Sequence, residues 1–269
     1  MKVAILGCGP AGLMAAAAIW SEDVLPDARL TILSMGEKSS LYGAQYLHAP
    51  IPYYTDEEDY VRVKYQMWGT AAEYRRKVYG ALWDGSVSPE DLAAEHSAWD
   101  IRETYDRLWE DFGPMVGQAK IDYAGLKILS AGQSGFGQFD LIINTIPRPA
   151  ICIEGHQFRS VQIIAAGDAP KLGIKVPYGK GLNENSVICN GNDHPSWYRL
   201  SNIFGHKTVE WADGTPVPLP NVAEVSKPIS TNCDCWPDIL HVGRYGKWEK
   251  GVLTHHAYEE VRKYFEART

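Results

Sequence analysis

The sequence predicts an α/β fold built from a central parallel sheet, a helical insertion and a smaller, mainly antiparallel sheet. A short apolar strand at residues 3–6 runs directly into a glycine-rich turn and an alanine-rich helix. A continuous apolar run at residues 139–145 is typical of a parallel strand buried on both faces. Between residues 150 and 211, short apolar runs alternate with Gly, Asn, Asp and Pro, as in an antiparallel sheet.

The N-terminal turn carries the pattern G-x-G-x-x-G at Gly7, Gly9 and Gly12. In a Rossmann-like domain the first glycine permits the tight turn, the second lets the backbone approach a pyrophosphate, and the third lets helix and strand pack closely. The helix N-terminus adds unpaired N–H groups and a partial positive charge. Because the motif joins a strand to a small-residue helix, it predicts nucleotide binding at Gly7, Gly9, Pro10, Ala11 and Gly12. An ordinary tight turn is the alternative.

The second strand of the parallel sheet is expected at residues 30–34. In a dinucleotide-binding fold an acidic residue usually ends this strand and binds the ribose hydroxyls. Here Ser34 ends the strand, and Glu37 lies slightly beyond it. We therefore expect either Ser34 or Glu37 to bind the ribose.

Residues 57–116 are rich in large aromatic side chains and are predicted to be helical. Ser88 followed by Pro89 is a typical helix start, and residues 101–112 place their apolar side chains on one helical face. We therefore expect three regions. They are a nucleotide-binding domain at residues 1–52, 117–149 and 236–269, a helical insertion at 53–116, and a mainly β substrate domain at 150–235.

The C-terminal region repeats the strand–glycine–helix pattern. A short strand at residues 238–242 precedes a glycine-containing segment at 243–251, and a helix is expected at 252–266. The N-terminus of this helix would offer a second patch of free N–H groups, suited to an electron-rich ring edge or a phosphate.

Composition and charge limit the partners that we expect. With 269 residues and a net charge of −7, the chain has room for a large core and no electrostatic footprint for nucleic acid or an anionic membrane. No apolar run approaches the roughly 20 residues of a membrane span, so we expect a cytoplasmic protein. The five thinly spread cysteines are expected to be thiols, and Cys233 with Cys235 is poor evidence for a metal site.

Together these segments resemble the FAD-binding superfamily that includes amine oxidases, UDP-galactopyranose mutase and Rab GDP-dissociation inhibitors. Residues 7–12 are similar to its pyrophosphate loop, and residues 139–147 to the strand that returns from the substrate domain. Residues 240–255 resemble its closing motif, where a helix N-terminus meets the flavin ring. Residues 192–205 resemble a substrate-sheet segment of the mutase-like members.

This resemblance implies FAD as the cofactor. The contacts that it implies beyond the glycine turn are Gln45, Thr145, Gly243, Arg244, Trp248, Gly251, Val252 and Leu253. A competing closing motif is Gly167 followed by Asp168, which resembles the A-G-D signature of disulfide-reductase-like flavoproteins. We favour Gly243 and Arg244, because about a hundred residues follow Asp168 and the chain has no C-x-x-C.

A few polar side chains are candidates for the chemistry. In the families named above, a glycine-containing loop after the second strand commonly crosses the flavin, and here that loop carries His48. Its imidazole titrates near neutral pH and could move a proton. The catalytic candidates are His48, Tyr198 and His255, and the candidates for binding an anionic or sugar substrate are His194 and Arg199. A structural or solvent-facing role is the alternative for each.

The resemblance implies an FAD-dependent oxidoreductase that takes hydride from a small amine or alcohol. The alternatives are a redox-neutral sugar-nucleotide mutase, a non-catalytic scaffold with this fold, and a protein that binds NAD(P) alone. The expected partner is a small-molecule substrate, free or carried on a macromolecule, with neither nucleic acid nor membrane. Because the chain is short for this superfamily, a homo-oligomer could complete the site.

Overall fold

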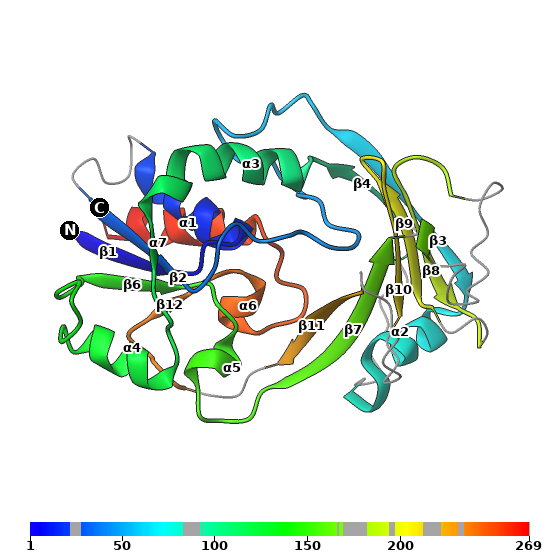
Figure 1. Cartoon of the computed structure of the whole chain (residues 1–269). Helices are drawn as coiled ribbons and strands as arrows, with labels where there is room; N and C mark the ends of the chain where they lie inside the picture. Colours follow the sequence, from blue (N-terminus) through cyan, green and yellow to red (C-terminus); the bar gives the residue numbers. More distant parts are fainter. Residues whose placement is uncertain are drawn as a thin grey trace.

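The computed structural model describes residues 1–21, 28–82, 92, 94–165, 167–168, 182–193, 197–211, 222–230 and 234–268. These residues form two β-sheets toward opposite ends of an elongated molecule, and both chain termini lie beside the first sheet (Figure 1). None of the described helices combines the length and the apolar character that a membrane crossing requires.

The first sheet consists of β12 (Leu240–His241), β6 (Leu141–Asn144), β1 (Lys2–Leu6), β2 (Arg29–Ser34) and β5 (Val116–Gln118), in that order. Every neighbouring pair is parallel, which confirms the predicted α/β fold with a central parallel sheet. In β1, Val3 and Ile5 face one side of the sheet, whereas Ala4 and Leu6 face the other. All four are buried because helices cover both faces, and β1 is therefore apolar throughout.

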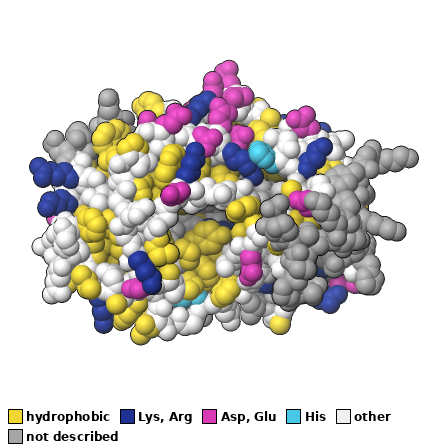
Figure 2. Space-filling model, in the orientation of Figure 1, with side chains coloured by type: hydrophobic (Ala, Val, Ile, Leu, Met, Phe, Trp, Pro, Cys, Tyr) yellow, Lys and Arg dark blue, Asp and Glu magenta, His cyan; other side chains and the backbone are white. Residues whose placement is uncertain are grey.

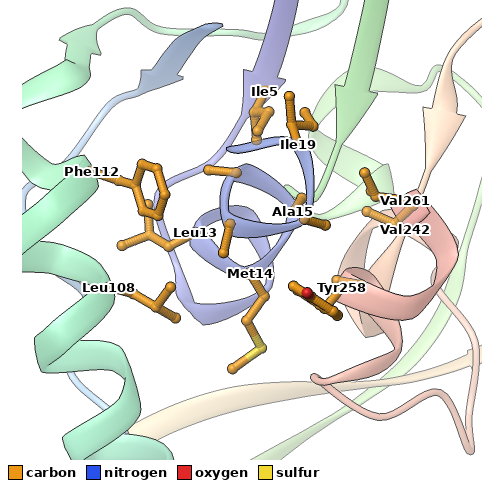
Figure 3. Close-up of a cluster of buried hydrophobic side chains, with 14 of the residues drawn as sticks. Ile5, Leu13, Met14, Ala15, Ile19, Leu108, Phe112, Val242, Tyr258 and Val261 are labelled. Atoms are coloured by element: carbon orange, nitrogen blue, oxygen red, sulfur yellow. The ribbon is translucent and has the colours of Figure 1, made fainter. Parts of the chain in front are cut away.

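Three helices cover one face of the first sheet (Figure 1). They are α1 (Pro10–Trp20), α3 (Ile101–Phe112) and α7 (His256–Glu266). Figure 3 shows Leu13 of α1 pointing toward Phe112 of α3, and Ala15 pointing toward Val261 of α7. The position of α3 confirms the amphipathic helix predicted at residues 101–112, and the carboxylate of Asp100 caps its first turn.

The opposite face of the first sheet packs against α4 (Tyr123–Ser130) and α5 (Arg148–Ile151). Immediately after β12, the short helix α6 (Gly243–Lys247) lies at the carboxyl ends of the strands. Short 3₁₀ turns occur at Gly80–Leu82 and Gly113–Met115.

The second sheet has seven described strands. In spatial order they are β11 (Ala223–Ser230), β7 (Gln157–Ala165), β10 (His206–Trp211), β9 (Arg199–Ile203), β8 (Ser186–Gly191), β3 (Val61–Gly69) and β4 (Glu95–Ala98). All neighbours are antiparallel except β3 and β8. The helix α2 (Ala71–Tyr79) packs on this sheet through Tyr74 and Val78. The predicted mainly antiparallel sheet is confirmed.

The prediction that residues 57–116 are helical is wrong for the segment that forms β3. Its sequence Val-Arg-Val-Lys-Tyr-Gln-Met alternates apolar and polar side chains, which is the period of a strand. The abundance of aromatic residues hid this alternation. As a result β3 and β4 widen the second sheet instead of belonging to a helical insertion. The predicted helix start at Ser88 lies outside the described residues.

The C-terminal helix begins at His256, four residues later than the sequence predicts. Gly251 adopts a φ of +85°, which a helix cannot accommodate. The backbone N–H of Leu253 then donates to Nδ1 of His256 at 3.2 Å. Residues 248–255 therefore form an ordered connection between α6 and α7.

Candidate functional site

The glycine turn at the end of β1 has the geometry of an open cradle. Gly7 has a φ of +102°, and a Cβ on Gly12 would lie 2.0 Å from the carbonyl oxygen of Gly7, so both positions require glycine. Gly9 is different. It is the N-cap of α1 with an ordinary extended backbone, and a Cβ there would find Ser39 Oγ as its nearest neighbour at 3.8 Å. The missing side chain at Gly9 thus leaves space in front of the helix.

The N-terminus of α1 has no side-chain cap and no acidic residue in its first turn. Its first backbone hydrogen bond is donated by Leu13 to the carbonyl of Gly9 at 3.1 Å, so the N–H groups of Ala11 and Gly12 precede the helical ladder. Pro10 has no N–H to satisfy. An uncapped helix N-terminus of this kind is able to bind an anion.

Three predicted cofactor residues lie around the turn, and they differ in their contacts with it. The hydroxyl of Thr145 donates to the carbonyl of Leu6 at 2.6 Å, so this side chain braces the turn from behind. Ser34 lies beside the turn, where its Oγ accepts from Cys8 Sγ at 3.2 Å. Glu37 is exposed, and only its backbone carbonyl contacts Cys8. Ser34 and Glu37 both remain predictions for the ribose contact.

The closing helix α6 packs directly on the glycine turn. Gly243 has a φ of +69°, and a Cβ there would lie 2.9 Å from the Cβ of Ala11. A Cβ on Gly246 would lie 2.2 Å from the carbonyl oxygen of Asn144. The competing pair Gly167 and Asp168 instead follows β7 in the second sheet. The structure therefore places the segment that begins at Gly243 at the cradle.

The predicted cofactor contacts that follow Gly243 differ in their surroundings. Arg244 is half-buried, and its Nε has no hydrogen-bond partner among the described residues. Trp248 is buried, and its indole N–H donates to the carbonyl of Gln157 at 3.0 Å, so it joins this segment to β7. The exposed Gly251 and the following Val252 and Leu253 form the approach to α7.

Four histidines gather where the loop after β2 meets β4 and the start of α7. The ring of His48 stacks on Tyr46 at 4.4 Å between centroids, and it lies 6.1 Å from His255 and 5.5 Å from His96. His255 in turn lies 4.5 Å from His256. The structure thus brings together two of the predicted catalytic residues, His48 and His255.

The protein environment keeps these two imidazoles neutral at pH 7. Burial, and then repulsion by the neighbouring imidazoles, lowers the pKa of His48 to about 4. Burial, and then His256, lowers the pKa of His255 to about 4. Nδ1 of His255 is buried and has no hydrogen-bond partner among the described residues. A neutral imidazole with a free ring nitrogen can accept or donate one hydrogen bond to a bound molecule.

Tyr198, which the sequence predicts to be catalytic, lies in a buried polar cluster of the second sheet, and this position favours a structural role. Its side chain is fully buried, and its hydroxyl donates to Glu210 Oε2 at 2.7 Å. Arg199 donates through Nε and Nη2 to the same carboxylate, at 2.7 and 2.6 Å. Lys227 Nζ lies 3.0 Å from Glu210 Oε2. His194, the other predicted substrate residue, lies outside the described residues.

The carboxylate of Glu210 is ionised at neutral pH. Burial alone would raise its pKa, but Arg199 and Lys227 hold the pKa well below its usual range. Burial and the charge of Arg199 lower the pKa of Lys227 to about 7. Sequence reasoning missed Glu210 and Lys227, although a Glu between Val and Trp in an apolar alternation was an available signal.

The loop after β2 joins this charged cluster to the histidines, and it reaches toward the second sheet (Figure 1). Gly43 has a φ of +78°, and the backbone N–H of Ala44 donates to Glu210 Oε1 at 3.4 Å. The side-chain amide of the predicted contact Gln45 donates to the carbonyl of Tyr42. Tyr46 donates to the hydroxyl of Tyr65 at 3.2 Å.

Figure 2 shows a recess in the middle of the molecule, between the two ends that carry the sheets, with mostly hydrophobic visible walls. A separate cavity of about 320 Å³ is lined by Met1, Lys2, Arg29, Gln138 and Asp140. It lies at the amino ends of β1 and β2. Because ligands of open α/β sheets bind beyond the carboxyl ends of the strands, the glycine turn is the candidate site and this cavity is not.

Known structures share the fold of the whole described chain. The 2,6-dihydroxypyridine-3-hydroxylase from Arthrobacter nicotinovorans matches with a TM-score of 0.55 and 10% identity, over 98% of this chain and 83% of that one. An HpxO variant from Klebsiella pneumoniae, complexed with FAD, matches with a TM-score of 0.51 and 11% identity, over 97% and 79%. The fold is that of the FAD-binding flavoproteins.

A third flavoprotein with this fold is the tryptophan C-6 flavin-dependent halogenase of taromycin biosynthesis. It matches with a TM-score of 0.55 and 14% identity, over 98% of this chain and 72% of that one. No family model and no curated protein matches the sequence. One of these proteins is named as a hydroxylase and another as a flavin-dependent halogenase, so the resemblance holds for the flavoprotein fold and not for the amine oxidase and mutase members in particular.

Proposed function

We propose that this protein is an FAD-dependent oxidoreductase that holds FAD on the glycine turn and acts on a small molecule bound between the two sheets. The observation that carries the proposal is the open N-terminus of α1 at Gly9, with α6 packed against Ala11. The fold that this chain shares with the FAD-binding flavoproteins supports it. A scaffold that had lost its cofactor would have no need of a missing side chain at Gly9.

The residues around the turn fit FAD. The N–H groups of Ala11 and Gly12 would bind the pyrophosphate, and Ser34 or Glu37 would bind the adenosine ribose. Arg244, whose Nε has no hydrogen-bond partner among the residues that the structure describes, would donate to a phosphate or to the ribityl chain. The connection at residues 248–255 would border the ring. Bound FAD supplies two-electron redox chemistry, while the protein supplies binding, orientation and exclusion of water.

The charges on the second sheet favour a neutral or anionic substrate over a cationic amine. Glu210 is the buried carboxylate there, and Arg199, Lys227 and Tyr198 already occupy its oxygens. Two basic side chains therefore face one acid. An ammonium group entering this region would meet like charge without a carboxylate of its own, which is costly in a buried setting. We therefore set the amine aside and keep the alcohol or another neutral group.

The histidines would position the substrate and hold a proton at a defined atom. His48 and His255 come from different elements and lie face to face with nearly parallel rings, at an interplanar angle of 29°. Because both are neutral, His255 Nδ1 can accept a proton from a substrate hydroxyl or donate a hydrogen bond to it. Tyr46, stacked on His48, fixes the ring of that histidine.

The reaction class follows from the way in which the flavin is reduced. In the first case the substrate itself reduces bound FAD, as in oxidation of an alcohol. In the second, NAD(P)H would supply the electrons and dioxygen would supply an oxygen atom to the substrate; one of the similar structures is named as a hydroxylase. We propose the second class, with a neutral or anionic aromatic substrate, because the recess has mostly hydrophobic walls.

The test begins with FAD titration of the purified protein, followed by anaerobic addition of NAD(P)H. We expect bound FAD with the two absorbance bands of an oxidised flavin, which NAD(P)H bleaches and air restores. Substrate screening under air would then compare phenols and aromatic acids with alcohols and amines. Failure to bind FAD would overturn the proposal. Bleaching by an alcohol without NAD(P)H would overturn the oxygenase class and leave the oxidoreductase.

A further inference from the structure

The chain leaves the first sheet after α5 and returns to it before β12, and two cysteines meet at this crossing. Cys152 ends α5, and Cys235 lies five residues before β12. Between them the chain builds β7, β8, β9, β10 and β11 of the second sheet. The Sγ atoms of Cys152 and Cys235 are 2.7 Å apart. This distance is well inside ordinary contact between two sulfur atoms and about 0.7 Å longer than a disulfide bond.

The surroundings hold the two thiols in place. The guanidinium of Arg148 donates to the carbonyl of Cys235 at 2.8 Å, and the indole of Trp236 donates to the carbonyl of Ile151 at 2.7 Å. These two hydrogen bonds run in opposite directions between the same two segments. The backbone on either side of the sulfur pair is therefore fixed, and little rearrangement is needed to bring the sulfurs into bonding distance.

We propose that Cys152 and Cys235 form a disulfide that links the segment leaving the first sheet to the segment returning to it. Both side chains are partly exposed, so an oxidant can reach them. The other two described cysteines, Cys8 and Cys189, are buried and belong to different parts of the fold. The proposal is independent of the flavin and revises the expectation that all five cysteines are thiols.

The reaction is a thiol–disulfide exchange with a small disulfide such as glutathione disulfide. One thiolate attacks a glutathione sulfur, the glutathione S–S bond breaks, and a mixed disulfide forms. The second thiolate then displaces the bound glutathione, and the S–S bond between Cys152 and Cys235 forms. The two protein sulfurs lose two electrons and two protons, and two glutathione thiols carry them away.

The cross-link has a structural consequence because it spans 83 positions in sequence. Joining residues so far apart removes much of the freedom of the unfolded chain, and the effect grows with the length of the closed segment. It also ties the outgoing and returning segments together where they connect the two sheets. We expect oxidised protein to melt about 5–10 °C above reduced protein, a shift typical of such a bond in a domain of this size.

The test uses the full chain, equilibrated with glutathione disulfide or with dithiothreitol, then denatured in an alkylating reagent and digested for mass spectrometry. We expect a peptide pair joined through Cys152 and Cys235 in oxidised protein only, lighter by the mass of two hydrogen atoms. Cys233→Ser is the matched control, which should keep both the link and the melting shift. Cys152→Ser should lose both.

Three outcomes would overturn the proposal. The first is complete alkylation of Cys152 and Cys235 after oxidation. The second is a link that joins Cys152 to Cys233 instead. The third is that both thiols resist alkylation and that a metal chelator, but not dithiothreitol, abolishes this resistance. That result would indicate a bound metal ion. Because none of these assays involves FAD, failure of this proposal leaves the proposed function untouched, and the converse also holds.

Discussion

Gly12 lies so close to Gly7 that a Cβ on Gly12 would stand 2.0 Å from the carbonyl oxygen of Gly7. This contact joins the first turn of α1 to the end of β1, and it aims the helix N-terminus across the carboxyl edge of the parallel sheet. Gly9, only three positions earlier, has space around it and an ordinary backbone conformation. The motif therefore contains glycines required by the fold and one that the fold alone does not require.

The first prediction follows from the packing of Gly12. Gly12→Ala should reduce the free energy of unfolding by about 3 kcal/mol or more, because backbone atoms must move to admit the methyl group. Urea denaturation followed by circular dichroism measures this change. Gly36→Ala is the control, since no atom of the described residues lies within 4 Å of a Cβ there. Equal stability of Gly12→Ala and the unmodified protein would refute the close contact.

The second prediction separates structure from chemistry at Tyr198. Tyr198→Phe removes a hydrogen bond to a buried carboxylate and should cost about 1–3 kcal/mol of stability, while substrate turnover stays within about twofold. Glu210→Gln removes the charge that Arg199 and Lys227 share, and it should cost more, about 3–5 kcal/mol. Thermal unfolding and steady-state kinetics measure both. A large loss of turnover in a Tyr198→Phe protein of normal stability would restore its catalytic role.

The third prediction concerns acid sensitivity. The pKa of His255 falls from 6.5 to about 4 on folding, so the unfolded state binds more protons between these values. The stabilisation is complete above pH 6.5 and is lost as the pH falls toward 4. We expect this histidine to account for about 1–3 kcal/mol of that loss.

Comparing the unfolding free energy of His255→Gln with that of the unmodified protein, from pH 7 downward, measures the contribution of His255. The variant should lose less stability than the unmodified protein over this interval. Parallel curves for the two proteins would show that His255 is protonated in the folded state as readily as in the unfolded one.

The sequence was sufficient for features that depend on neighbouring residues. The strand and glycine turn at residues 3–12 and the amphipathic helix that became α3 are local patterns, and the structure confirms both. The prediction of a helix at β3 was wrong because it gave more weight to the aromatic content of this segment than to its two-residue alternation of apolar and polar side chains. The helix α7 starts later than predicted because residues 252–255 are not helical and the backbone N–H of Leu253 donates to His256 Nδ1, a side-chain contact that periodicity does not report.

Contacts between distant segments could not be predicted from local patterns. His48 and His255 are far apart in sequence, and only the tertiary fold brings their rings next to each other. The same is true of Glu210, whose carboxylate accepts hydrogen bonds from Arg199 of β9, from Lys227 of β11 and from the backbone N–H of Ala44. The buried hydrogen bond from Tyr198 to Glu210 is likewise a contact that local sequence patterns do not reveal.

The central claim is that FAD binds on the turn in front of Gly9, and its most direct test is calorimetric titration of FAD into Gly9→Ala. Because a Cβ at Gly9 would make only an ordinary contact with Ser39 Oγ at 3.8 Å, this variant should fold with a stability within about 1 kcal/mol of the unmodified protein. Its methyl group would occupy the pyrophosphate position, so FAD affinity should fall about 100-fold or more, or by about 2.7 kcal/mol. Gly36→Ala should bind FAD normally. Unchanged FAD affinity in a folded Gly9→Ala protein would contradict the account.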